Sequence, residues 1–413
     1  MREMKESGID WIGKIPQNWN IIRAKNIFKN HKDIVGDKEN EYERLALTLN
    51  GVLKRPKDDS KGLQSESLST YQILNEKELV FKMIDLANVN TSRVGYSPYT
   101  GIVSPVYIIF NNDKYSKFGY YYFYSMWQRE IFNNLGNDGV RSALNASDMM
   151  NLPFPDISSE EANKIARFLD KKIIEIDNVI EKTKETIEDY KKYKQSYISK
   201  VITKGLEQTK EKKDSNVEYI GKCPKDWKIM KLKFAAKIRN EKYEWKYGDI
   251  EYFALENIES ESGKFINTDN VYDREGSIIC NKDDVVFGKL RPYLAKVYKV
   301  KNLSCCSSEF AVFYDFKGKV DYLKYLLLSY GFIKIVDAST YGTKMPRANI
   351  DFIKNMLIPL PNTETQERIA SHLNNKCKEI DILIENKQKI IEELEQYKKS
   401  LIYEYVTGKK EVV

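Results

Sequence analysis

The stretch that decides the fold is residues 165–201, IARFLDKKIIEIDNVIEKTKETIEDYKKYKQSYISKV, which has a second copy in the same register at residues 369–405. Its apolar positions follow one another at alternating steps of four and three residues, the heptad spacing of a helix that buries a narrow stripe against another helix. Lys and Glu fill most positions between them, as on the solvated faces of a coiled coil. We predict that the two helices pair with each other, with the loosest packing at Thr183, Lys194, Lys387 and Lys398. The stripe comprises Leu169, Ile173, Ile176, Ile180, Thr183, Ile187, Tyr190, Lys194, Tyr197 and Val201, and its copy comprises Leu373, Cys377, Ile380, Ile384, Lys387, Ile391, Leu394, Lys398, Leu401 and Tyr405.

The repeat extends beyond the helices to the whole chain. WIGKIPQNW at residues 11–19 returns as YIGKCPKDW at 219–227, and LPFP at 152–155 returns as IPLP at 358–361. The offset between the copies drifts only slightly, so the chain is interpreted as a tandem duplication with small loop insertions. Two copies are too few for a solenoid, which favours a duplicated globular unit followed by a helix.

Each copy changes from strand-like to helical patterning along its length. Short β-rich runs alternate with Gly, Asn and Asp turns over about residues 40–110 and 248–315, and a short helix is expected near 117–135 and near 320–336. Capping residues precede each long helix, and Gly205 follows the first. The predicted fold class is α+β: two similar, mostly β domains separated by two long helices that form an intramolecular antiparallel coiled coil with pseudo-two-fold symmetry. The predicted boundaries are 1–155 for the first domain, 156–205 for the first helix, 206–215 for a linker, 216–361 for the second domain and 362–413 for the second helix.

The composition is that of a globular chain with several domains. The chain has 413 residues, of which 42% are hydrophobic and 31% charged. It contains no apolar run long enough to span a bilayer and no apolar segment near its start, so we expect neither a membrane partner nor secretion. The five cysteines show no CxxC pairing and the two histidines are His31 and His372, so a zinc site has few candidate ligands and a reduced, cytoplasmic protein is expected. The formal net charge of +7 permits a polyanionic partner without requiring one.

Motifs of catalysis are missing from the chain. There is no GxxxxGK[ST] phosphate-binding loop, no GxGxxG after a strand, no HExxH, and no Asn/Asp-Pro-Pro-aromatic tetrapeptide of an amino-methyltransferase. Asp156, Glu160 and Glu161 loosely resemble a nuclease carboxylate cluster, but their place at a helix start favours capping. We therefore expect no catalytic residue, no metal ligand and no cofactor in this chain.

Basic residues next to glycine turns are better candidates for a binding site. Arg suits bidentate contact with phosphate or guanine edges, and Lys suits phosphate. For each basic group taken alone, a solvated surface charge explains the pattern about as well as a contact does. The aromatic run at 120–124 is expected to pack in the core rather than to stack on bases. The candidate nucleic-acid-binding residues are Lys54, Arg55, Lys57, Arg93, Tyr96 and Arg141 in the first copy and Lys289, Arg291, Tyr293, Lys296, Lys344 and Arg347 in the second.

The chain resembles the specificity subunit of type I restriction–modification systems. The resemblance rests on Trp/Tyr-Ile-Gly-x-x-Pro-x-x-Trp at the start of each copy, on Gly-Lys-Leu-Arg-Pro-Tyr-Leu at 288–294, and on Pro-x-Pro before a helix that carries Gln366 and Ile369. It covers essentially the whole chain, including the duplication and both helices. Two positions depart from the pattern: the first copy has FKMIDL at 81–86 in place of the Gly-Lys-Leu-Arg motif, and Asn163 stands where glutamine is usual at the helix start.

This resemblance implies a non-catalytic DNA reader. Each globular unit would be a target recognition domain for one half of a split, asymmetric site in double-stranded DNA, and the coil would hold the two at a fixed spacing. The implied partners in a prokaryotic cytoplasm are two modification subunits, which use S-adenosylmethionine to methylate adenine N6, and restriction subunits, which use ATP and Mg. Chemistry on the base would take place in the modification subunit.

Two other functions stay open from the residues alone. One is a structural adaptor that joins proteins through the coiled coil and reads no DNA. The other is a self-sufficient methyltransferase or nuclease, which the missing motifs disfavour. A strong salt dependence of DNA binding, expected where phosphate contacts supply the affinity, would separate the reader from the adaptor.

Overall fold

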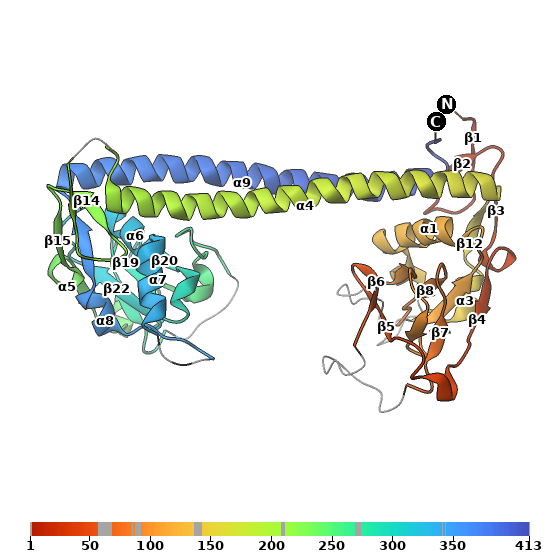
Figure 1. The fold of residues 1–413 in the computed structure, drawn as a ribbon, viewed down its shortest axis with the longest axis horizontal. Helices are drawn as coiled ribbons and strands as arrows, with labels where there is room; N and C mark the ends of the chain where they lie inside the picture. Colours follow the sequence, from red (N-terminus) through yellow and green to blue (C-terminus); the bar gives the residue numbers. More distant parts are fainter. Residues whose placement is uncertain are drawn as a thin grey trace. The chain divides into compact units, whose positions relative to one another are not determined.

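The computed structural model describes residues 2–56, 68–84, 86, 92–135, 143–207, 211–268, 274–340, 342 and 344–412. Its internal contacts divide the chain into two units: unit 1 comprises Met1–Lys182 and Ile390–Val413, and unit 2 comprises Thr183–Lys389. Each unit holds a globular domain of strands and short helices together with one end of each of the two long helices (Figure 1). The predicted α+β architecture of two domains connected by long helices is therefore confirmed.

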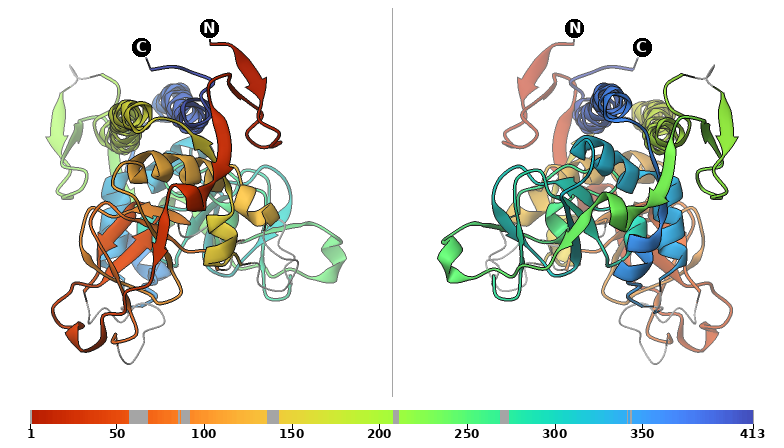
Figure 2. Two further views of the ribbon diagram at one scale, coloured as in Figure 1. Left: turned by 90° about the vertical axis from the view of Figure 1, so that its right-hand side faces the viewer. Right: turned by 90° about the vertical axis from the view of Figure 1, so that its left-hand side faces the viewer.

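The long helices are α4, Ser159–Lys204, and α9, Thr363–Val406. They lie side by side in each unit, as the two end-on views show (Figure 2). In both units rising residue numbers on α4 meet falling numbers on α9, so the pairing is antiparallel, as predicted. The cross-helix contacts in unit 1 are Phe168 with Tyr405 and Asp177 with Lys398, and those in unit 2 are Lys194 with Asp381 and Tyr197 with His372.

The predicted stripe is buried or half-buried along both helices. Lysines at stripe positions are accommodated by carboxylates on the facing helix: Lys194 Nζ lies 2.7 Å from Asp381, and Lys398 Nζ lies 2.6 Å from Asp177. The helix ends follow the expected capping chemistry. The Ser158 hydroxyl accepts a hydrogen bond from the Glu161 amide at the start of α4, and Gly205 closes that helix with φ +73°.

Each domain is built on a four-stranded antiparallel sheet of the same strand order. In both domains the helix that follows the second strand of that order packs against the third and fourth strands. The sheet of unit 1 has the order β4 (Lys29–His31), β11 (Ile108–Asn111), β8 (Leu79–Phe81), β9 (Val94–Tyr96), with helix α1 (Ser116–Gln128). The sheet of unit 2 has the order β16 (Lys237–Arg239), β22 (Phe310–Tyr314), β19 (Val285–Gly288), β20 (Val297–Lys299), with helix α6 (Val320–Leu328).

Two further kinds of strand pair recur in both copies, and the remaining strands differ between them. The pairs shared by both copies are β1 (Met4–Glu6) with β2 (Lys14–Pro16), β3 (Asn20–Arg23) with β12 (Pro153–Asp156), β13 (Lys212–Asp214) with β14 (Lys222–Pro224), and β15 (Lys228–Lys231) with β23 (Leu357–Leu360). Unit 1 adds the hairpin β5 (Leu45–Thr48) with β6 (Gly51–Lys54) and the pair β7 (Gln72–Leu74) with β10 (Gly101–Val103). Unit 2 adds β17 (Glu251–Phe253), β21 (Ser304–Cys306) and β18 (Ile278–Cys280) in that order, with β17 and β21 parallel.

The remaining helices are short. They are α2 (Ile131–Leu135), α3 (Ala146–Met150), α5 (Leu232–Ala235), α7 (Tyr330–Ala338) and α8 (Ile350–Asn355), with 3-10 turns η1 (Ala24–Asn26), η2 (Gly36–Lys38), η3 (Trp245–Tyr247), η4 (Leu255–Asn257) and η5 (Pro292–Leu294).

Two details of the predicted elements are wrong. Each short helix expected near 117–135 and 320–336 is broken in two, at Glu130 with φ +58° and at the extended Ser329. Part of the predicted linker 206–215 is strand β13, because Lys213 donates its amine to the Trp227 carbonyl and the strand pairs with β14.

The domain cores are rich in aromatic side chains. Trp19 and Trp227, equivalent positions of the two copies, are both fully buried. Tyr121, Tyr122 and Phe123 of α1 are buried as well, so the aromatic run packs in the core as predicted. Among the described residues no helix is both long and apolar enough to cross a membrane.

Candidate nucleic-acid interface

The segment after strand β19 forms a tight loop in unit 2. Gly288 ends the strand where a Cβ would lie 3.0 Å from the Leu255 side chain, so glycine lets the chain pack closely there. Arg291 adopts the left-handed conformation, with φ 51° and ψ 62°, and Pro292 then opens the 3-10 turn η5. A non-glycine residue in this region costs about 1 kcal/mol or more, so the surrounding contacts must hold it in place.

Backbone hydrogen bonds hold this loop against the segment before α8. The Arg291 amide donates to the Pro346 carbonyl at 2.8 Å, and the Ala348 amide donates to the Lys289 carbonyl at 2.9 Å. The Lys289 amide in turn donates to the Glu309 carbonyl at 2.8 Å. The fold therefore brings together two groups of candidate residues that are distant in sequence, Lys289 and Arg291 on one side and Arg347 on the other.

Positive charge gathers on this paired loop. Burial lowers the pKa of the Lys289 amine, and the nearby charges of Arg347 and Lys242 lower it further, while Glu309 opposes them. Arg347 and Glu309 form an ion pair with Nη2 and Oε1 2.5 Å apart. The Glu309 carboxylate thus lies near both Lys289 and Arg347. We call Lys242, Lys289, Arg291 and Arg347 the basic cluster.

Arg291 is the member of the basic cluster best presented to a partner. Its side chain is exposed and makes no hydrogen bond or ion pair with any residue that the structure describes. A guanidinium with unused donors on a fixed backbone suits bidentate contact with a phosphate or a guanine edge. Tyr293 on η5 and Lys344 are also exposed. These placements are compatible with the predicted contacts of Lys289, Arg291, Tyr293, Lys344 and Arg347, which stay predictions.

Two of the predicted contact residues make hydrogen bonds to carbonyl groups of neighbouring loops. Arg93 and Lys296 occupy equivalent positions, each one residue before the last strand of its four-stranded sheet. Arg93 is 1% exposed and donates from Nη1 to the Ile84 carbonyl at 2.9 Å. Lys296 Nζ donates to the carbonyls of Leu255 and Ile258 at 2.7 and 2.9 Å, and burial lowers its pKa. Arg93 is buried, so the prediction of a surface contact is corrected for this residue, whereas Lys296 is half-buried and its contact with DNA stays a prediction.

Unit 1 places different chemistry where unit 2 has the basic cluster. The Leu144 amide donates to the Met83 carbonyl at 3.0 Å, as Ala348 does to Lys289 in unit 2. A bridge between Ile84 and Ala143 likewise corresponds to the bridge between Leu290 and Arg347. Met83 is buried and Ala143 carries no charge, so two cations of unit 2 have apolar counterparts.

The other candidates of unit 1 are scattered. Lys54 at the end of β6 forms an ion pair with Glu43 at 2.5 Å, and this hydrogen bond raises its pKa. Arg55 follows it and is half-buried. Tyr96 on β9 is half-buried beneath Lys117, whose amine lies 4.5 Å from the ring centre, and burial raises the pKa of its hydroxyl. Lys57 and Arg141 lie outside the described residues.

Sequence reasoning missed two neighbours of the basic cluster. Lys242 belongs to it although it lies on another loop, and Trp245 on the same loop is 86% exposed. The alternation of aromatic and charged residues in YEWKY at 243–247 was the available signal. Within the described ranges no three His, Cys, Asp or Glu side chains converge as metal ligands.

Comparison with solved structures defines the class of the fold. The chain matches a structure titled "Structural basis underlying complex assembly and conformational transition of the type I R-M system", with TM-score 0.69 and 12% identity over 95% of this chain and 98% of the other. It also matches the crystal structure of the HsdS subunit from Thermoanaerobacter tengcongensis, with TM-score 0.53 and 13% identity over 96% and 98%. The fold is that of a specificity subunit.

Sequence comparison gives the family. Residues 224–396 match the family described as type I restriction modification DNA specificity domain. The type I restriction enzyme MjaVIII specificity subunit of Methanocaldococcus jannaschii is 26% identical over 96% of this chain and 94% of its own length. The putative MjaX specificity subunit of the same organism is 25% identical over 96% and 95%. The chain is thus similar over nearly its whole length to type I restriction enzyme specificity subunits.

Proposed function

We propose that this chain is the DNA-reading subunit of a type I restriction–modification system. It binds double-stranded DNA and recognises a split, asymmetric site, with each globular domain reading one half. The observation that carries the proposal is the basic cluster, in which the exposed Arg291 side chain has no partner among the described residues and lies on a loop held by backbone hydrogen bonds. The apolar counterparts Met83 and Ala143 in unit 1 support two unlike readers, since equal readers on a pseudo-two-fold scaffold would recognise equal half-sites.

The chemistry is assigned to partner proteins. Two modification subunits bring S-adenosylmethionine and methylate adenine, and restriction subunits bring ATP and Mg. The chain supplies sequence recognition and a scaffold, and it holds no cofactor of its own. The similarity to specificity subunits supports this assignment.

The decisive experiment is to map methylated adenines in cells that express the chain together with its modification partner. A bipartite motif with unlike halves is expected, and cells that express the partner alone are the control. A palindromic motif, or no methylation that depends on the chain, would contradict the proposal.

A coiled-coil adaptor without DNA readout is the second candidate, because α4 and α9 alone explain a scaffold role. The two are separated by titrating the purified complex with duplex DNA at several salt concentrations. The reader loses affinity steeply as salt rises, because phosphate contacts release counterions. The adaptor shows no salt-dependent DNA binding.

A further inference from the structure

The loop between β16 and β17 in unit 2 presents a tryptophan to solvent. Of the five tryptophans in the chain, Trp19 and Trp227 are buried, Trp11 and Trp127 are half-buried, and Trp245 is 86% exposed. Burial of a large aromatic side chain normally contributes about 2 kcal/mol to folding. The fold gains little of this contribution from Trp245.

The exposure does not result from a loose loop. Trp245 begins the 3-10 turn η3, and the Gly248 amide donates back to the Trp245 carbonyl at 3.0 Å. Gly248 has φ +68°, and its carbonyl accepts a hydrogen bond from the Tyr243 hydroxyl at 2.9 Å. The Tyr247 amide donates to the Glu244 carbonyl at 3.0 Å. The Tyr243 ring lies beside the indole, 6.1 Å between centroids, so the tryptophan is held outward on an ordered turn.

The carboxylates of this loop lie beside cationic or hydroxyl groups. Its carboxylates all have partners: Glu244 with Lys246 at 2.9 Å, Asp249 with Arg274 at 2.5 Å, and Glu241 with the Tyr247 hydroxyl and with Arg239 at 3.7 Å. Lys242, at the start of the loop, is a member of the basic cluster and acts on the Lys289 amine. The exposed indole and the cations of the basic cluster therefore belong to neighbouring loops of one domain.

The corresponding loop of unit 1 shows that the fold does not require an outward aromatic residue. That loop contains the 3-10 turn η2, and its aromatic residue Tyr42 packs against a small core of Val35, Tyr71 and Ile102. The aromatic ring of this loop thus packs inward in unit 1, whereas Trp245 of the corresponding loop in unit 2 points outward.

We infer that Trp245 contacts the bases of the half-site read by unit 2, entering a groove of the duplex as an apolar wedge beside the phosphate contacts of the basic cluster. The inference rests on the proposed DNA-reading function and adds a named base-contacting residue to it. Apolar side chains inserted at base steps unstack them locally and bend the duplex, and an indole ring stacks on any base. The contact adds affinity without neutralising phosphate.

Tryptophan fluorescence tests the contact directly, because Trp245 is the one strongly exposed tryptophan. The full chain is purified with its modification partner, and acrylamide quenching is measured with and without a duplex that carries the methylated motif. DNA is expected to shield a fraction of the emission in the wild type, and this change is absent in Trp245→Phe. Shielding by the partner alone, before DNA is added, would overturn the inference in favour of a protein contact.

Binding measurements complete the test. Trp245→Ala is expected to weaken binding of the motif about tenfold, with Trp245→Phe close to the wild type. The slope of affinity against salt stays unchanged, because no phosphate contact is lost. The matched control is Phe234→Ala, which removes a 55% exposed aromatic side chain on α5 of the same unit and leaves binding unchanged.

The outcomes separate this inference from the function on which it rests. Motif binding by the wild type, with Trp245→Ala binding equally well and no shielding, overturns the inference while the DNA-reading function stands. Failure of the wild-type complex to bind any duplex overturns both. An unchanged melting temperature in Trp245→Ala is expected and excludes misfolding as the cause of weaker binding.

Discussion

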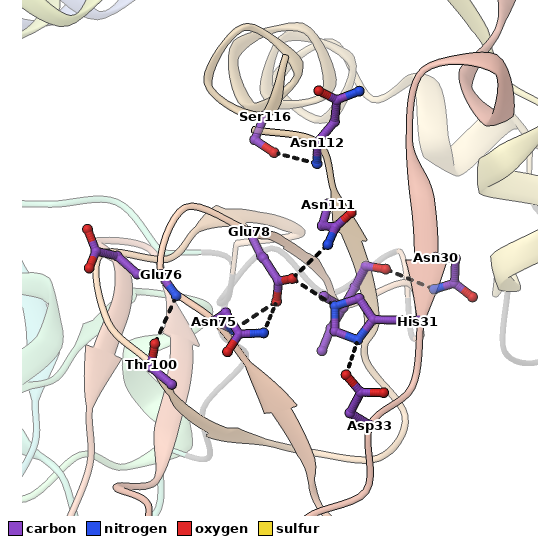
Figure 3. Close-up of polar contacts among 11 residues, drawn as sticks. Asn30, His31, Asp33, Asn75, Glu76, Glu78, Thr100, Asn111, Asn112 and Ser116 are labelled. Atoms are coloured by element: carbon purple, nitrogen blue, oxygen red, sulfur yellow. Dashed lines mark hydrogen bonds and ion pairs between the residues drawn. The ribbon is translucent and has the colours of Figure 1, made fainter. Parts of the chain in front are cut away.

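The two domains hold an equivalent polar site in which a carboxylate meets different basic side chains. In unit 1 His31 on β4 contacts Glu78 through Nε2 at 2.8 Å and Asp33 through Nδ1 at 3.2 Å (Figure 3). In unit 2 Arg239 takes the place of His31, and its guanidinium meets Asp284 with two hydrogen bonds of 2.9 and 3.2 Å. The guanidinium is always charged and donates in a fixed fork, whereas the imidazole engages both carboxylates as a donor only when protonated.

The carboxylates of these sites have a second task that both copies retain. The Asn75 amide donates to Glu78 at 2.8 Å, and the Asn281 amide donates to Asp284 at 2.9 Å, which closes the turn before the inner strand of each sheet. The surroundings of the cation differ. Asn111 donates to Glu78 in unit 1, whereas the Arg239 guanidinium of unit 2 lies over an aromatic ring. Both copies thus keep the carboxylate and the turn that it closes, whereas the basic side chain beside it differs between the domains.

The largest predicted effect is the loss of the arginine in unit 2. Arg239→Ala leaves the Asp284 carboxylate, 6% exposed, without its cation, and breaking a buried pair costs about 3–5 kcal/mol. His31→Ala in unit 1 is expected to cost about 1–2 kcal/mol, because it removes hydrogen bonds from a ring that is partly exposed. Hydrogen exchange of strand peptides from β16 and from β4 measures the two effects in one experiment.

Exchange of the cations sharpens the same comparison. His31→Arg is expected to be tolerated, since it reproduces the pair found in unit 2. Equal losses of stability in Arg239→Ala and His31→Ala would show that the two hydrogen bonds of the guanidinium give no advantage over the imidazole at this site.

The helix C-termini give a second matched pair of positions. Gly205 after α4 and Gly408 after α9 both have positive φ, +73° and +71°. A Cβ on Gly408 would lie 2.5 Å from the Pro16 ring, whereas a Cβ on Gly205 would lie 3.2 Å from Trp227. Gly408→Ala should therefore cost about 3 kcal/mol and Gly205→Ala about 1–2 kcal/mol.

Chemical denaturation of the two glycine variants checks this order. The lower free energy of unfolding of Gly408→Ala should be accompanied by faster hydrogen exchange in the β1–β2 hairpin. That of Gly205→Ala should be accompanied by faster exchange in the β13–β14 pair. The reverse order would mean that Pro16 moves away at little cost.

The sequence predicted the features that depend on periodicity and local chemistry. The heptad stripe, the duplication and the cap at Ser158 follow from the spacing and types of residues along the chain, and the structure contains all three. Strand β13 was missed because a charged run of three residues lacks a strand pattern, and it becomes a strand through pairing with β14. Arg93 was misassigned because its burial and its hydrogen bond to the Ile84 carbonyl arise from tertiary structure. The exposure of Trp245 was indicated in the sequence only by the alternation of aromatic and charged residues at 243–247.

A smaller effect is expected at Arg291, where the domains differ in their outward surface. Arg291→Ala removes an exposed guanidinium with no partner among the described residues, so stability should not change. Loss of a bidentate base contact costs about 1–3 kcal/mol of discrimination. Recognition should relax at one half of the methylated motif only, and methylation mapping of the variant measures this. Equal relaxation at both halves would indicate a general defect rather than a contact in unit 2.

The smallest predicted change in stability concerns Lys289, whose counterpart in unit 1 is the buried Met83. Burial lowers the pKa of the Lys289 amine, so folding is opposed while this amine is charged. The opposition is fully present at neutral pH and fades as the pH rises through the folded and then the unfolded pKa of lysine. Lys289→Met should therefore raise the free energy of unfolding at neutral pH by less than about 1 kcal/mol, since solvent screens the half-exposed amine.

Binding should move in the opposite direction to stability in the same variant. A phosphate next to Lys289 favours the charged amine, so Lys289→Met should weaken DNA binding and reduce the salt slope by about one unit. Lys242→Met is the matched control, because Lys242 is exposed and its removal lacks the stability gain. A variant of Lys289 that is more stable and binds DNA with an unchanged salt slope would assign this lysine to the fold alone. The basic cluster would then consist of Lys242, Arg291 and Arg347.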